Sequence, residues 1–165
     1  MKKISFAFSL IMLSLLVGNC TKDKANAESA YVKAAIGTIA FYSNKDKVNV
    51  GEDANPQRGT IGGTEQVTIT AESEASTGTD KDYLVIAFGY KAGDIKTYSI
   101  EQKEAISAYH KSGSDDDIAQ TGTVTITDNK VSDGSLGRYL HGTFDITTQK
   151  GVHVSNGTFT VYVNY

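Results

Sequence analysis

The sequence predicts an all-β protein, an antiparallel β-sandwich of eight or nine strands, with a small closed β-barrel as the alternative. Three observations support this class. Several segments alternate strictly between apolar and polar residues, the period of a strand with one buried face. The 165 residues include 16 Gly but a single Pro, and the strand formers Thr, Val, Ile and Tyr are abundant. Turn residues separate the alternating segments at intervals of roughly 10 residues, as in sandwiches and barrels.

The clearest strands lie near the C-terminal end, in "GTVTIT", "RYLHGTFDIT" and "GTFTVYVNY". In each, every second residue is apolar and is expected to point into the core, while the residues between face solvent. "DNKVSDGS" and "TQKGVHVSNG" separate these strands and are expected to be turns. The core predicted from these strands consists of Val124, Ile126, Phe144, Phe159, Val161 and Val163.

Earlier segments show the same pattern less regularly. "EQVTITAE" places Val67 and Ile69 inside, and "DYLVIAFGY" is apolar on both faces, which predicts a central strand. Further strands are expected at 32–42, 95–100 and 105–110. Residues 99–111 are ambiguous between a helix and strand–turn–strand, because "SIEQ" matches a helix capping box. The apolar residues there form no sustained helical stripe, so strand–turn–strand is preferred.

The N-terminal segment predicts a secreted, lipid-modified protein. Two lysines precede an apolar stretch that is too short to cross a bilayer, which is typical of a signal peptide. The stretch ends in "LVGNC", which resembles the lipobox of bacterial lipoproteins, and this resemblance implies that Cys20 is lipidated with fatty acyl chains such as palmitate. "ANA" at 25–27 is a competing cleavage site, but it lies beyond a charged segment. The predicted organisation is a lipoprotein signal peptide at 1–19, the lipidated cysteine with a flexible tether at 20–30, and one β-sandwich domain at 31–165.

The C-terminal quarter carries a resemblance. "GTVTIT", then "GTF" at 142–144 and "NGTF" at 156–159, resemble the closing strands of a family of small Bacteroidetes lipoproteins of unknown function. "LVGNC" resembles the lipobox of bacterial lipoproteins, with Asn19 where Gly, Ala or Ser is usual. The resemblance implies a compact β-sandwich tethered to the outer membrane. It implies no activity and no catalytic residue.

The sequence contains no recognisable catalytic motif or cofactor motif. The formal net charge is −3 and no basic patch with interleaved aromatic residues occurs, so nucleic acid is not an expected partner. No Ser, His and carboxylate stand at the spacing of a known nucleophile motif, and no enzyme activity, cofactor or metal is expected. After lipidation of Cys20 no thiol remains for catalysis or metal binding.

Isolated polar residues are interpreted as ordinary surface. The three histidines, His110, His141 and His153, are dispersed and are interpreted as surface residues; the alternative is that His141 and His153 meet across neighbouring strands at a metal. Aspartates 115–117 are consecutive, so their carboxylates should diverge in a solvated loop rather than converge on calcium. Glu72 and Glu74 share a strand face, as an acid–base pair would, but their polar setting favours a surface role.

One candidate binding surface remains, composed of Tyr139, His141 and Tyr162 on the outward faces of neighbouring strands. The preferred function is an outer-membrane-anchored structural or interaction module, with a protein or a glycan as partner. The alternative is a carrier of a small ligand, glycan or lipid, which needs an apolar cavity of about 300 Å³ or more. A hydrolase is the least favoured class. The expected location is the cell envelope, on the outer membrane, with the periplasmic and surface sides both open.

Overall fold

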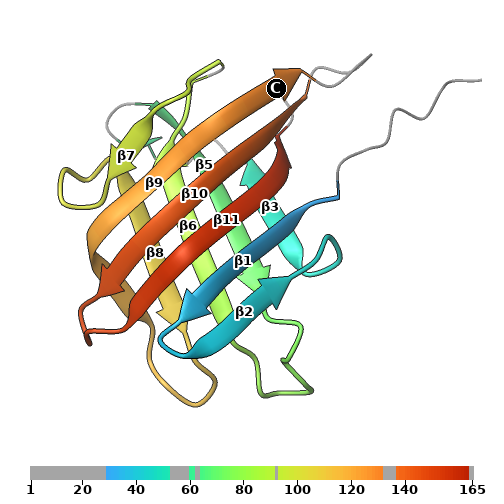
Figure 1. The fold of residues 1–165 in the computed structure, drawn as a ribbon, viewed down its shortest axis with the longest axis vertical. Coiled ribbons are helices and arrows are strands. Elements are labelled where there is room, and N and C mark those ends of the chain that lie inside the picture. Colours follow the sequence, from blue (N-terminus) through green and yellow to red (C-terminus); the bar gives the residue numbers. More distant parts are fainter. Residues whose placement is uncertain (1–28, 53–59, 62–63, 92, 132–136, 164–165) are drawn as a thin grey trace, which may run out of the picture.

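The computed structural model describes residues 29–52, 60–61, 64–91, 93–131 and 137–163. Every regular element in these residues is a strand (Figure 1). The strands are β1 (Tyr31–Ile36), β2 (Ile39–Ser43), β3 (Val48–Glu52), β4 (Thr60–Ile61), β5 (Thr64–Glu72), β6 (Tyr83–Gly89), β7 (Thr97–Ser99), β8 (Ala105–His110), β9 (Asp117–Val131), β10 (Arg138–Thr148) and β11 (His153–Val163). The predicted all-β class is confirmed. Within the described ranges, no helix has the length and apolar character needed to span a membrane.

Nine strands form one antiparallel path in the order β2-β1-β11-β10-β9-β8-β6-β5-β3, while β4 pairs with β5 and β7 with β9. In Figure 1 the strands from β9 to β2 form one layer, and β8, β6, β5 and β3 form the layer behind it. The long strand β9 joins the two layers, because Ile118 pairs with β8 whereas Thr121 and the residues after it pair with β10. The sheet therefore folds over on itself into a nearly closed barrel, which combines the sandwich and barrel expectations.

The core lies between the two layers. Its centre is a group of rings in which Phe88 lies 5.1 Å from Tyr98 and 6.2 Å from Phe159, between ring centroids. Phe159 also stacks on Phe144 at 6.4 Å. All six core residues predicted from the C-terminal strands are buried, each 3 % exposed or less, which confirms the assignment of the strand faces. β6 lies between β5 and β8, as its apolar character on both faces predicts.

The repeated "GTF" forms a reciprocal pair across β10 and β11. In this register Gly142 is opposite Phe159, Thr143 opposite Thr158, and Phe144 opposite Gly157. A Cβ added to Gly142 would lie 2.2 Å from Cζ of Phe159, and one added to Gly157 would lie 2.4 Å from Cδ2 of Phe144. Because each inward glycine has no side chain, it leaves the space that the opposite phenylalanine ring occupies.

Several boundaries differ from the predictions. Residues 32–42 are not one strand, because Gly37, with φ of +58°, turns the chain between β1 and β2. β3 and β4 were not predicted at all. β9 continues through Val131 and β11 begins at His153, so much of both predicted turns is strand. The extensions of β9 and β11 share a cause, since turn-forming residues are tolerated in strands whose backbone is paired with a neighbour, here β10.

Residues 99–111 form strand, turn and strand, as preferred from the sequence. Ser99 Oγ accepts a hydrogen bond from the Gln102 amide at 3.2 Å, as in a capping box. Lys103 then takes a φ of +59°, outside the helical region, and its amide donates to the Ile100 carbonyl at 3.0 Å. The chain therefore turns back into β8 instead of continuing as a helix.

Candidate functional site

The outward residues of β7, β9, β10 and β11 form a row of four threonines. Thr97 is opposite Thr125, Thr125 opposite Thr143, and Thr143 opposite Thr158. The hydroxyls of Thr97 and Thr125 are hydrogen-bonded at 2.9 Å. We call the surface formed by the outward residues of β9, β10, β11 and β1 the outer face. Because the inner faces of these strands are packed in the core, the outer face is held on a rigid support.

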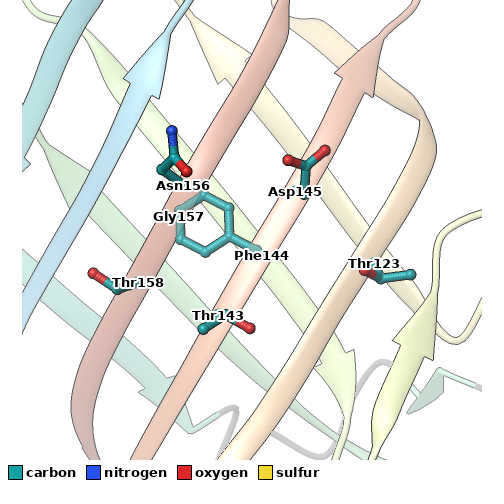
Figure 2. Close-up of a pocket in the computed structure, with 7 residues that line it drawn as sticks. All are labelled: Thr123, Thr143, Phe144, Asp145, Asn156, Gly157 and Thr158. Atoms are coloured by element: carbon teal, nitrogen blue, oxygen red, sulfur yellow. The ribbon is translucent and has the colours of Figure 1, made fainter.

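A recess lies on the outer face beside this row (Figure 2). It has a volume of about 430 Å³, and we call it the bulge recess. The residues that line it are Thr123, Thr143, Phe144, Asp145, Asn156, Gly157 and Thr158. The side chains of Thr143, Asp145, Asn156 and Thr158 surround Phe144 and Gly157 in Figure 2. The Phe144 ring is directed inward, so only the backbone of Phe144 and Gly157 is left on the outer side as the floor.

A β-bulge positions the polar side chains of the recess. The pairing of β10 with β11 shifts between Phe144 and Ile146, where Asp145 on β10 faces an extra residue on β11. Asn156 lies in this bulge with a φ of +52°, a left-handed conformation that asparagine adopts more readily than most residues. Bulges re-aim side chains and often occur beside functional sites.

The charged groups around the recess are already paired. The Asp145 carboxylate lies 2.8 Å from Nε2 of His153, and both side chains are more than half exposed. On β1, Lys33 is opposite Thr158 and its ammonium lies over the rings of Tyr31 and Tyr42, at 5.0 and 5.4 Å. The seven lining residues include one charged group, Asp145. The recess is therefore polar and presents little charge.

The predicted patch of Tyr139, His141 and Tyr162 lies on the same outer face. Tyr139 and Tyr162 are directly opposite each other, with ring centroids 5.1 Å apart. His141 is opposite Thr160, and its Nδ1 lies 3.0 Å from the threonine hydroxyl oxygen. Since residues two apart on a strand share a face, His141 links the tyrosine pair to Thr143 and the recess. The patch and the recess form one continuous surface.

The recess residues could not be recognised as a site from the sequence. The outward positions of Thr143, Asp145 and Thr158 were predicted, but their convergence depends on the register of β10 against β11. One signal was present in the sequence, because a glycine inside a strand pattern, as in "SNGTF", often marks a bulge.

The other histidines are held by aspartates rather than gathered at one site. Nδ1 of His110 lies 2.8 Å from the Asp116 carboxylate. The interpretation that His141 and His153 meet is wrong, because His141 is opposite Thr160 whereas His153 is opposite Thr147, six residues further along β10. Within the described ranges, no three His, Cys, Asp or Glu side chains are grouped closely enough to hold a metal ion.

The aspartate run is only partly a solvated loop. Asp117 is 5 % exposed and begins β9. Its carboxylate accepts hydrogen bonds from the Thr148 hydroxyl at 2.6 Å and from the Lys150 amide at 3.0 Å. The interpretation of all three aspartates as solvated is therefore wrong for Asp117, which holds the β10–β11 turn.

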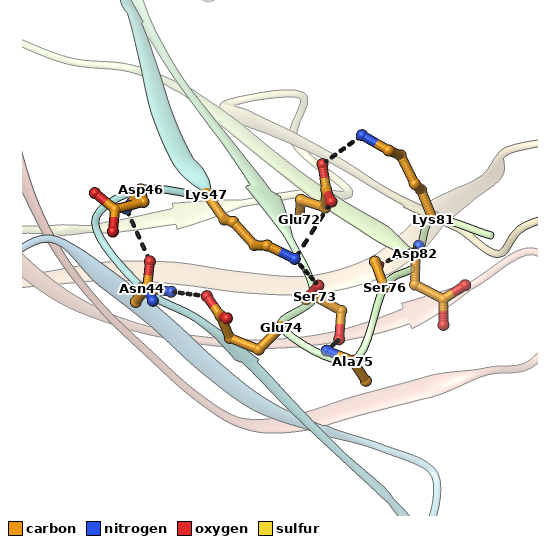
Figure 3. Close-up of polar contacts among 10 residues, drawn as sticks. All are labelled: Asn44, Asp46, Lys47, Glu72, Ser73, Glu74, Ala75, Ser76, Lys81 and Asp82. Carbon is orange, nitrogen blue, oxygen red and sulfur yellow. Dashed lines mark hydrogen bonds and ion pairs between the residues drawn. The ribbon is translucent and has the colours of Figure 1, made fainter. Parts of the chain in front are cut away.

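Glu72 and Glu74 stabilise the region where β2 leads into β3 (Figure 3). The Glu72 carboxylate pairs with Lys81 at 3.1 Å and with Lys47 at 3.4 Å, and the hydrogen bond from Lys81 lowers its pKa. The Glu74 carboxylate accepts the Asn44 amide at 3.3 Å. Each carboxylate therefore binds its own structural partners and the two do not act as an acid–base pair, which agrees with the surface interpretation.

Cys20 and the predicted signal peptide lie outside the described residues. Comparisons of the chain with protein-family models, with curated proteins and with solved structures gave no significant match.

Proposed function

We propose that this chain is a cell-envelope lipoprotein, anchored to the outer membrane through Cys20, whose β-domain binds a partner through its outer face. The anchor is supported by the lipobox-like "LVGNC" after the apolar leader. The leading tether would hold the domain near the membrane while allowing it to reach a partner.

The observation that carries the binding role is the continuity of the outer face. The tyrosine pair, His141, the threonine row and the bulge recess follow one another along β10 and β11. Tyrosines supply large contact areas with few rotatable bonds, and a rigid sheet loses little conformational entropy on binding. Such a surface is suited to contact rather than to chemistry.

The interior is less suited to a bound ligand. Between the layers, the described core is occupied by the Phe88, Tyr98, Phe144 and Phe159 rings. The carrier alternative would require these rings to separate, whereas the outer face needs no rearrangement.

Site-specific photo-crosslinking in living cells tests this proposal. A photoreactive residue is placed at Thr143 or Thr123 on the outer face, and at Ile106 or Thr70 on the opposite layer as matched controls. We expect crosslinked products from the outer-face positions that the control positions do not give. Identical products from both layers, or none from the outer face, would contradict the proposal.

A further inference from the structure

We infer that the bulge recess binds one ring of a neutral, hydroxyl-rich sugar within a glycan. This inference rests on the proposed function, because it names the class of partner for the same outer face. A protein partner is the competing possibility and is separated from the glycan by the test below.

The hydrogen-bonding groups of the recess match a sugar. Thr123, Thr143 and Thr158 each offer a hydroxyl that both donates and accepts. The Asn156 amide does the same with separate atoms, and the Asp145 carboxylate, whose Oδ1 is paired with His153, has a second oxygen that accepts hydrogen bonds. A sugar carries hydroxyls on adjacent carbons, and each of them is both a donor and an acceptor, so a sugar can pair with several of these neighbouring groups at once. Apolar ligands would leave these groups unsatisfied, which costs free energy.

The charge of the recess favours a neutral ligand. Asp145 is the charged member of the lining, and no lysine or arginine is among the seven residues. A phosphate, sulfate or uronate placed there would face a like charge without a lining cation to offset it. The ammonium of Lys33 is held over the Tyr31 and Tyr42 rings instead. Acidic glycans are therefore disfavoured.

The size and surroundings agree with an oligosaccharide. The volume of about 430 Å³ lies within the usual range of small-molecule sites, about 300–1,000 Å³. Tyr139 is four residues from Thr143 on β10, about 13 Å along the strand. When one sugar ring of an oligosaccharide occupies the recess, the Tyr139–Tyr162 pair is therefore placed to contact a neighbouring sugar of the same oligosaccharide.

The test measures binding of defined oligosaccharides to the intact chain, purified in detergent, by titration calorimetry. The probes are neutral hexasaccharides of glucose, mannose, galactose and N-acetylglucosamine, with oligogalacturonate and a heparin-derived hexasaccharide as acidic counterparts. Two variants remove a hydroxyl from the recess with little change in shape, Thr143→Val and Thr158→Val, and a third, Asn156→Gly, removes the side-chain amide. Asn156→Gly suits the positive φ, because glycine adopts it without strain. Thr70→Val on β5 is the matched control, with urea unfolding of every variant as the check on folding.

We expect at least one neutral hexasaccharide to bind and the acidic ones to bind more weakly. Each recess variant should weaken binding by roughly threefold to tenfold, the loss of one hydrogen bond, while Thr70→Val changes it less than twofold. Binding of acidic probes alone, or neutral binding unaffected by the recess variants, would overturn the inference. If no sugar binds while outer-face positions still crosslink to a protein, the inference fails and the proposed function stands. If neither sugar binding nor outer-face crosslinks occur, both fail.

Discussion

Replacing Gly142 by alanine tests whether the paired "GTF" segments determine how β10 packs on β11. The new Cβ would lie 2.2 Å from Cζ of Phe159, 2.6 Å from its Cε1, and 2.7 Å from the carbonyl oxygen of Thr125. All three distances are well below van der Waals contact, so the ring must leave its position or the strands must separate. Overpacking of a core costs about 1–3 kcal/mol. We expect Gly142→Ala to lower the free energy of unfolding by that amount.

A double-mutant cycle identifies the cause. Phe159→Ala alone should cost about 3–5 kcal/mol, as expected for a phenylalanine that is 1 % exposed. In the Phe159→Ala background the two closest contacts are gone, so the added methyl group should cost less by about 0.5–3 kcal/mol. The measurement is urea unfolding followed by tyrosine fluorescence and circular dichroism, since the chain has nine Tyr and no Trp.

Gly51→Ala is the matched control. It lies on β3, where among the described residues a new Cβ would meet only atoms of Thr68, at 3.9 Å. This substitution should change stability by no more than about 0.5 kcal/mol, as is usual at such sites. If Gly142→Ala is as mild as Gly51→Ala, or if its cost is the same with and without the Phe159 ring, the steric explanation is refuted.

Three other predictions concern the anchor, alkaline stability and the bulge. Intact mass analysis of the membrane-extracted protein should show diacylglycerol on Cys20, and a mature chain starting at Glu28 would contradict the anchor. Burial, together with the charge of Asp82, raises the pKa of Tyr109 to about 12. In the unfolded chain the tyrosine hydroxyl ionises near pH 10. The contribution of Tyr109 to the free energy of unfolding is therefore full below about pH 10 and is lost between about pH 10 and 12. Tyr109→Phe should make urea unfolding midpoints fall less steeply over that window, and an unchanged slope would show that Tyr109 does not contribute. Asn156→Val should cost about 1–3 kcal/mol, whereas Asn156→Gly should be nearly neutral, and equal costs would mean that the positive φ is not the cause.

The C-terminal strands could be predicted because their information is local. Val124, Ile126, Phe144 and Phe159 recur at period two, and one buried sheet face is sufficient to produce that pattern. β3 could not be found in this way. Its sequence "VNVGE" is only five residues long, and its pairing with β5 depends on residues about 20 positions further along the chain. The turn at Gly37 was missed because "IGTI" continues an apolar pattern. Apart from the glycine itself, nothing in the sequence indicates the positive φ that separates β1 from β2.

The candidate site was predicted only in part for the same reason. Tyr139, His141 and Tyr162 could be assigned to outward faces from alternation alone. The bulge recess depends on a register shift between β10 and β11, which no local pattern specifies. The sequence therefore predicted which side chains face outward but not which of them converge.

The "GTF" repeat combines a requirement of the core with a property of the surface. Its glycines and phenylalanines face inward and fit one another, and this fit accounts for both residue types. The threonine between them takes no part in that packing. Thr143 and Thr158 face outward, opposite each other, and both line the recess. Valine would serve a strand equally well at either position, since it shares the β-branched shape of threonine. Thr143→Val and Thr158→Val should therefore leave unfolding unchanged within about 0.5 kcal/mol. With stability constant, any loss of sugar binding in these variants reports on the hydroxyls themselves.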